Sequence, residues 1–217
     1  MFNLETELVC RFFSKNSRSG DIMKKMDIAR KIINQNGGIA KTSELNKAGL
    51  QNFEIAKLCN NGELERVKQG YYQIANQEDI SEEKMITTFF KEGIVCMDSA
   101  LFYYGYSDKT PSVWTIAVPR SVTRSKLKID NFAYRVYFIQ NDNLLLGKTE
   151  GIFNGVKLPV YDRERTICDC FKYRTKMDRE LFDKAVNAYI VDDNKNLGNL
   201  FRYAEKMRVY KKVHEVF

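Results

Sequence analysis

The sequence contains a single histidine, which leaves few possibilities for acid–base or nucleophilic catalysis. His214 lies close to the C-terminus, in a segment that we expect to be mobile, so it is a poor partner for a Ser–His–Asp or Cys–His pair. Cys168 and Cys170 have the wrong spacing for a zinc-binding turn, and no second pair of Cys or His residues accompanies them. We therefore expect no catalytic residue and no metal site.

Phosphate-loop and magnesium chemistry are the other enzymatic alternatives. Gly147-Lys148-Thr149 is similar to the end of a phosphate-binding loop, but that motif requires a glycine five residues earlier, where this chain has Asp142. We therefore expect no bound nucleotide and no cofactor. Scattered carboxylates could still meet in space as the Mg²⁺ site of a nuclease. These carboxylates are Asp98, Asp130, Asp142, Glu150, Asp162 and Asp169. A nuclease, or a nucleotide-transferring enzyme brought to DNA by the first third of the chain, therefore stays open as the enzymatic alternative.

One charged pair stands at helical spacing. Arg165 and Asp169 are four residues apart, so on a helix their side chains share one face and can pair. They follow Arg163 and a β-rich segment, and we expect them to tie this helix to Asp98. Partly buried Arg–Asp pairs fix the packing of elements more often than they take part in catalysis. A structural role is therefore favoured.

Polar and basic side chains in the first third of the chain have the types needed to contact DNA. Residues 24–72 contain nine Lys or Arg and five Asp or Glu, a net charge of +4. Glutamine and asparagine can hydrogen-bond base edges in the major groove, whereas basic side chains meet phosphates. The candidates for base contacts are Gln51, Asn52 and Lys57, and those for phosphate contacts are Arg66 and Lys68.

Short helices are predicted to position these side chains. Apolar residues recur at helical spacing at positions 26, 29, 32 and 33, before the stop at Gly37-Gly38. A second helix is expected from Thr42, with Thr42 or Ser43 as its cap, and it ends at Gly49.

A third helix and a hairpin follow. The segment 51–60 has Asn52 as a possible cap, and its apolar positions include Phe53 and Leu58. Residues 64–67 and 71–74 are strand-like, and Gly70 between them can take the positive φ of a tight turn.

Helix, turn, helix and basic hairpin is the order of a winged helix-turn-helix domain. In such domains a helix enters the major groove and basic residues beside it meet the phosphates. The same order also occurs in small domains that bind proteins, so the pattern leaves a protein adaptor open as an alternative.

The composition is that of an ordinary globular protein. Of 217 residues, 44% are hydrophobic and 29% charged, and the net charge of +7 favours an anionic partner without specifying one. No apolar run reaches the roughly 18 residues of a membrane helix, and the first 20 residues lack a secretory signal. We expect a cytoplasmic protein without membrane contact, whose five cysteines are reduced.

Three regions are predicted along the chain. Residues 1–22 form an N-terminal extension, 23–78 the winged helix-turn-helix domain, and 79–217 a mixed α/β domain with a small sheet and several helices. The overall fold class is therefore α+β.

The second domain is expected to begin with a helix over residues 84–90 and to continue with a mixture of strands and helices. Asp98 is a possible cap for a brief helix that ends at Gly105, and Asn154-Gly155 predicts a tight hairpin. The predicted strands are residues 113–118, 133–139, 152–153 and 156–161, and the later helices are 163–172, 179–191 and 196–209.

The order and spacing of several motifs resemble the AbiEi family, the antitoxins and transcriptional repressors of type IV toxin–antitoxin systems. The likeness covers about residues 24–215. It rests on the opening helix, on Thr42-Ser43-Glu44-Leu45-Asn46-Lys47-Ala48-Gly49, on the segment from Leu58 to Tyr72, on Asp98-Ser99-Ala100-Leu101, and on Arg163-Glu164-Arg165-Thr166-Ile167-Cys168-Asp169.

The resemblance implies a non-enzymatic protein of phage defence. Its winged helix would repress its own operon by binding double-stranded DNA at inverted repeats, as a monomer or weak dimer that pairs on DNA. Its second domain would neutralise a nucleotidyltransferase-like toxin. Asp98 stands where the family often has histidine, and the stretch before Met23 is additional. The residues expected to contact DNA are Thr42, Ser43, Lys47, Gln51, Asn52, Lys57, Arg66, Lys68 and Tyr71, and the second-domain motif consists of Asp98, Arg163, Arg165 and Asp169.

Overall fold

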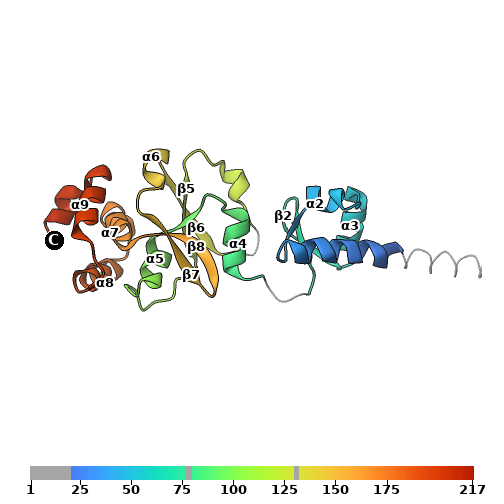
Figure 1. Cartoon of the computed structure of the whole chain (residues 1–217), viewed down its shortest axis with the longest axis horizontal. Coiled ribbons are helices and arrows are strands. Elements are labelled where there is room, and N and C mark those ends of the chain that lie inside the picture. The colour runs from blue at the N-terminus through green and yellow to red at the C-terminus, as the bar shows by residue number, and fades with distance from the viewer. Residues whose placement is uncertain (1–20, 77–79, 130–131) are drawn as a thin grey trace, which may run out of the picture. The chain divides into compact units, whose positions relative to one another are not determined.

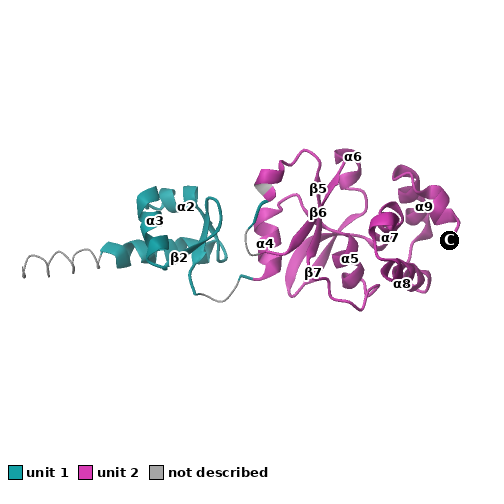
Figure 2. Ribbon diagram, turned by 180° about the vertical axis from the view of Figure 1, so that it is seen from behind, with its two compact units in different colours: residues 1–80, 128–131 teal, residues 81–127, 132–217 magenta. Residues whose placement is uncertain are grey.

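The computed structural model describes residues 21–76, 80–129 and 132–217, and it has the α+β architecture expected from the sequence, with two separate sheets. The chain divides into two compact units, residues 1–80 with 128–131 and residues 81–127 with 132–217 (Figure 2). Most of the predicted extension 1–22 and the predicted boundary at residues 78 and 79 lie outside the described residues.

The described part of the first unit starts with a helix over residues 21–35, called the opening helix, and continues with short helices and a three-stranded antiparallel sheet (Figure 1). Gly37 and Gly38 follow the opening helix with φ of 75° and 104°, a conformation that terminates helices. The sheet order is β1-β3-β2. The elements are β1 (Ala40–Lys41), α2 (Thr42–Lys47), α3 (Asn52–Asn60), β2 (Leu64–Lys68) and β3 (Tyr71–Ile74).

A compact apolar core joins these elements. Met26, Ala29 and Ile33 from the opening helix are buried, as their spacing predicted. They pack with Leu45 of α2, with Ile55 and Leu58 of α3, and with residues of the hairpin. On α3 the buried face is therefore formed by positions 55 and 58, whereas Phe53 is 65% exposed.

The predicted helix caps are wrong in both short helices, by one residue for Thr42 and Asn52 and by two for the alternative Ser43. Lys41 precedes α2 and Gln51 precedes α3, so Thr42 and Asn52 are the first helical residues. In each case the glutamate three residues after the cap accepts a hydrogen bond from the cap's backbone N–H: Glu44 from Lys41 and Glu54 from Gln51, both at 2.8 Å. This glutamate, half of a capping box, fixes the start of each helix.

The second unit is built on a five-stranded mixed sheet in the order β6-β5-β4-β8-β7. Strand β4 is parallel to β8 and antiparallel to β5, and β5 is parallel to β6. The helices and strands up to the end of the sheet are α4 (Glu82–Phe89), β4 (Ile94–Val95), α5 (Met97–Tyr103), β5 (Trp114–Pro119), η1 (Arg124–Leu127), β6 (Tyr134–Ile139), α6 (Asn141–Leu144), β7 (Lys148–Phe153) and β8 (Val156–Tyr161).

A group of helices completes this unit. The buried side chains of α7 and α9 share one apolar core, which also takes in α8 and α10. These elements are α7 (Arg163–Lys172), η2 (Arg174–Lys176), α8 (Arg179–Ile190), α9 (Leu197–Lys206) and α10 (Tyr210–His214).

Two local predictions for this unit have opposite outcomes. Asn154 and Gly155, with φ of 46° and 79°, form the predicted tight turn between β7 and β8. Asp98, in contrast, does not cap α5, because Cys96 occupies the cap position and Asp98 is the second residue of the helix.

The cysteines behave as small apolar groups, as predicted for the ones described. Cys96, Cys168 and Cys170 are buried, Cys59 is half-buried, and all four are free thiols. Burial raises the pKa of the Cys168 thiol, which keeps it protonated. Cys10 lies outside the described residues.

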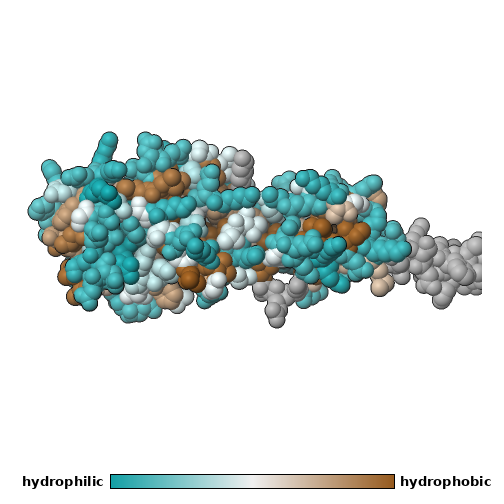
Figure 3. All heavy atoms as spheres, in the orientation of Figure 1, coloured by the Kyte–Doolittle hydropathy of each residue, from teal (hydrophilic) through white to brown (hydrophobic). Residues whose placement is uncertain are grey.

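Hydrophilic side chains cover most of the face seen in Figure 3, and apolar side chains gather there in separate patches. Within the described residues, no helix has the length and apolar character needed to span a bilayer.

Candidate functional site

The exposed side chains of α3 occupy one arc of the helix. At about 100° per residue, positions 52, 56, 60, 53 and 57 follow one another over about 140°. All five are exposed, while Ile55 and Leu58 on the other side are buried. Two of the predicted base-contact residues, Asn52 and Lys57, mark the two edges of this arc.

Phe53 lies within that arc, between Asn60 and Lys57, and was not predicted as a site residue. Its side chain is 65% exposed although it is large and apolar. An exposed aromatic between polar residues suits contact with an apolar group of a ligand, such as the methyl group of thymine in the major groove. The spacing could have shown this: Phe53 lies two residues before the buried Ile55 and five before the buried Leu58, which places it on another face of the helix.

The start of α3 is held by two side-chain contacts. The amides of Asn46 and Asn52 are hydrogen-bonded at 3.1 Å, so α2 orients the first residue of α3. Lys25 of the opening helix forms an ion pair with Glu54. The backbone hydrogen bond from Gln51 and this ion pair lower the pKa of Glu54. The charge of Lys25 is thereby balanced by that of Glu54, and the pair adds no net charge to the surface.

On α2, the predicted residues divide into one structural and two exposed ones. Thr42 Oγ1 donates to the carbonyl oxygen of Gly70 at 3.3 Å, and the Thr42 backbone N–H donates to the same oxygen at 2.9 Å. Thr42 therefore connects α2 to the hairpin turn. Ser43 and Lys47 are exposed and four residues apart, which places them on one face of the helix.

Three basic side chains lie near two tyrosines of the hairpin. Arg66 is exposed opposite Tyr72, with its guanidinium 5.9 Å from that ring centre. Lys41 and Lys68 each lie 5.9 Å from the centre of the Tyr71 ring. Lys41, from β1, was not among the predicted residues, because the sequence did not reveal a strand so short.

Arg66 and Lys68 are not equivalent. The register of β2 shifts between them, which is typical of a β-bulge, and Val67 between them is buried. Arg66 is exposed, whereas Lys68 is half-buried and burial lowers the pKa of its ammonium. Arg66 is therefore the better placed of the two for a phosphate contact.

In the second unit, Arg165 and Asp169 form the predicted pair. Arg165 Nε lies 3.2 Å from Asp169 Oδ2, and both side chains are fully buried. The guanidinium also donates to the carbonyl oxygens of Asn143 and Leu146, at 2.7 and 2.9 Å. It therefore secures α7 to helix α6 and to the loop between α6 and β7.

Gly147 in that loop is required by the packing of Arg165. Its φ of 72° favours glycine, and a Cβ atom there would lie only 2.5 Å from Arg165 Cβ. The glycine of Gly147-Lys148-Thr149 is thus explained by this close approach.

The predicted link between Arg165 and Asp98 is wrong. Arg165 points toward α6 and the loop after it, whereas Asp98 lies half-buried on α5. Burial raises the pKa of Asp98, and the positive charge of Arg135 on β6 opposes that rise. Asp98 is therefore separate from the other motif residues.

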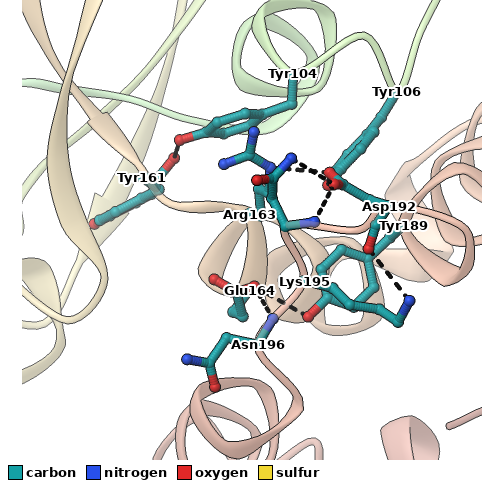
Figure 4. Close-up of polar contacts among 10 residues, drawn as sticks. Tyr104, Tyr106, Tyr161, Arg163, Glu164, Tyr189, Asp192, Lys195 and Asn196 are labelled. Carbon is teal, nitrogen blue, oxygen red and sulfur yellow. Dashed lines mark hydrogen bonds and ion pairs between the residues drawn. The ribbon is translucent and has the colours of Figure 1, made fainter.

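Arg163 belongs to a different polar cluster (Figure 4). Its Nε lies 2.9 Å from Asp192 Oδ2, and the Tyr106 hydroxyl donates to the same oxygen at 2.5 Å. The Arg163 guanidinium lies 4.8 Å from the centre of the Tyr104 ring, and the Tyr104 hydroxyl donates to the Tyr161 carbonyl oxygen. These contacts join the start of α7 to the segments that follow α5 and α8.

Asp192 provides a test of this cluster. The hydrogen bond from Tyr106, together with those from Asn194 and Arg163, lowers the pKa of Asp192 from 3.8 to about 2. A lowered folded-state pKa stabilises the fold above the ordinary pKa, and this stabilisation is lost as the pH falls through the folded value. We expect Asp192→Asn to lower the free energy of unfolding by about 1–2 kcal/mol at pH 6, with the difference shrinking between pH 4 and pH 2.

Urea unfolding at several pH values measures this difference. Asp193→Asn is the matched control, because Asp193 is the exposed neighbour and should show little effect at any pH. A difference for Asp192→Asn that stays constant from pH 5 to pH 2 would contradict the assignment.

No group of three or more His, Cys, Asp or Glu side chains in the described residues is arranged to hold a metal ion. Of the six carboxylates considered for a magnesium site, Asp169 is taken up by Arg165 and Glu150 pairs with Lys157 at 2.5 Å. Asp130 lies outside the described residues.

Among known proteins, a solved structure has a fold similar to that of this chain. No family model matches the chain, and no curated protein does. A solved structure, the crystal structure of the RV2827C protein from Mycobacterium tuberculosis, is similar with a TM-score of 0.56. The similarity covers 82% of this chain and 70% of that chain at 12% sequence identity. At this identity the likeness concerns the fold alone.

Proposed function

We propose that this protein is a non-enzymatic, sequence-specific DNA-binding repressor whose first unit acts as a winged helix-turn-helix domain. The observation that carries the proposal is the exposed arc of α3, which begins at Asn52 and contains Lys57, followed by a hairpin with the exposed Arg66. Side chains of these types can contact base edges and phosphates.

Two copies of the protein binding together would raise the affinity for DNA. The net charge of +4 over residues 24–72 is modest, and DNA affinity rises with the number of phosphates contacted. Two copies on the arms of an inverted repeat, about one helical turn apart, would double the contacts. The resemblance to the AbiEi family supports the same arrangement.

The second unit is proposed to act as the antitoxin part, directed at a nucleotidyltransferase-like toxin. This role is carried over from the same family resemblance. Co-expression tests it: the chain should restore growth to cells that express a nucleotidyltransferase-like gene from the same operon. Growth arrest that persists when the chain is present would refute the antitoxin role and leave the DNA-binding proposal intact.

A promoter fusion tests repression directly. A reporter gene placed behind the DNA upstream of this protein's own gene should lose expression when the chain is supplied, and recover it when the upstream inverted repeat is scrambled. Expression that does not change would favour the adaptor alternative, in which the first unit binds protein.

Base recognition is expected to reside in the residues at the start of α3. Replacing Gln51 or Asn52 with alanine should remove the preference for the native base at one position, at a cost of about 1–3 kcal/mol for that sequence. Binding to duplexes with each base pair changed in turn measures this preference. Gln35→Ala and Asn61→Ala are matched controls at exposed positions outside the start of α3. Loss of affinity that is equal for all sequences would contradict a base contact.

A further inference from the structure

A small acidic and aromatic pocket lies in the second unit, apart from every residue considered above as a DNA contact. Its volume is about 220 Å³. The walls come from four places in the fold: the start of α4, the middle of α5, the segment that leads into β5, and the turn between β7 and β8. The lining includes Glu82, Glu83, Phe102, Trp114, Phe153 and Asn154.

The two carboxylates of the pocket are held in place by neutral donors. Trp114 Nε1 donates to Glu82 Oε2 at 2.6 Å, and Asn154 Nδ2 donates to Glu83 Oε1 at 2.7 Å. Glu83 is only 4% exposed. No Lys, Arg or His of the described residues forms an ion pair with either glutamate, and no basic residue lines the pocket.

A buried carboxylate without a cation is costly, because hydrogen bonds from neutral groups replace only part of its hydration. Glu83 is nine-tenths buried and lines the pocket, and the donor to its Oε1 is the neutral amide of Asn154. The position at the start of α4 favours negative charge but does not require two adjacent glutamates beside a pocket.

Aromatic rings line the same pocket and would also attract a cation. The Trp114 and Phe153 rings lie 5.6 Å apart with an angle of 60° between them, and Phe153 stacks on Tyr103 at 4.5 Å. Phe102 contributes a further ring, 43% exposed. Aromatic faces attract organic cations, most strongly when the ring is tryptophan.

We infer that this pocket binds an ammonium or guanidinium group carried on a short aliphatic stem. The carboxylates of Glu82 and Glu83 meet the charge, and the aromatic rings cover the stem. A volume of about 220 Å³ is smaller than the roughly 300–1,000 Å³ of sites for larger ligands, and it suits a single basic side chain or a small alkylamine.

Trp114 makes the site directly observable because it is the only tryptophan of the chain. Its indole N–H gives one NMR signal, and this N–H donates to Glu82 within the pocket. The full chain is titrated with n-butylammonium chloride and ethylguanidinium chloride, with sodium chloride and n-butanol as charge and stem controls. A saturable shift of the indole signal is expected with the two organic cations and absent with the controls.

Variants then localise the binding. Glu83→Gln should weaken it at least tenfold, and so should Glu82→Gln, which changes an exposed residue and is expected to leave the fold intact. Glu92→Gln, an exposed glutamate that does not line the pocket, should bind as the native chain does. Shifts that match those of sodium chloride, or that persist when Glu82 and Glu83 are both replaced by glutamine, would overturn the proposal.

The source of the cation follows from one further comparison. Nα-acetyl-lysine methylamide carries the same ammonium and stem as butylammonium, with peptide groups added. Tighter binding of the capped lysine assigns the pocket to a side chain of a partner protein. Equal binding assigns it to a free amine.

Discussion

Replacing Arg165 with methionine is expected to lower the free energy of unfolding of the second unit by about 3–5 kcal/mol. The substitution keeps much of the side-chain length but leaves the carboxylate of Asp169 buried without its cation, and it removes the hydrogen bonds to the carbonyl oxygens of Asn143 and Leu146. Urea unfolding followed by circular dichroism measures the change.

An exposed pair with the same spacing is the matched control for this prediction. Arg179 and Asp183 are also four residues apart, at 3.7 Å, but Arg179 is 87% exposed. Arg179→Met should therefore cost no more than about 1 kcal/mol. The double change Arg165→Met with Asp169→Leu should recover part of the loss, since no buried charge remains. A loss for Arg165→Met no larger than that for Arg179→Met would contradict the structural role of the buried pair.

Removing the basic side chains of the hairpin is expected to weaken DNA binding about equally on all sequences. Each phosphate contact contributes roughly one unit to the slope of the logarithm of the binding constant against the logarithm of the salt concentration. Arg66→Ala should therefore reduce this slope by about 1. Lys68→Ala should reduce it less, because Lys68 is half-buried beside Tyr71.

Titrations of labelled duplex at several salt concentrations give these slopes. Gln69→Ala is the control, because Gln69 is a neutral, exposed residue of the same hairpin turn and should leave the slope unchanged. An unchanged slope for Arg66→Ala and Lys68→Ala together would remove the hairpin from the DNA-binding surface.

Much of the local structure was predictable from the sequence. The Asn154-Gly155 turn followed from the dipeptide itself, and α7 followed from its apolar stripe, because both signals lie within a few residues of chain. Strands β1 and β4 were missed since each has two residues, too few for an alternating pattern. The one-residue errors at the helix caps arose because Thr42 and Asn52 suit the cap position by type, whereas Glu44 and Glu54 decide it.

The arrangement of the site residues was less predictable. The pairing of Arg165 with Asp169 followed from their spacing, but the other partners of Arg165 are backbone carbonyls of α6 and of the loop after it. Carbonyl groups occur at every residue and carry no sequence signal. The predicted link from Arg165 to Asp98 was wrong because Asp98 was chosen by its charge alone, whereas the actual partners include carbonyl groups. The exposure of Phe53 required knowledge of which face of α3 packs on the core.

Sequence-specific binding to its own upstream DNA is the central claim for this protein. Fluorescence anisotropy of a labelled duplex from the region upstream of its gene, titrated with the full chain at fixed physiological salt, measures it most directly. An unlabelled duplex of scrambled sequence and equal composition serves as competitor. The proposed repressor predicts a preference for the native duplex of roughly 1,000-fold or more. Equal affinity for the native and scrambled duplexes would contradict it.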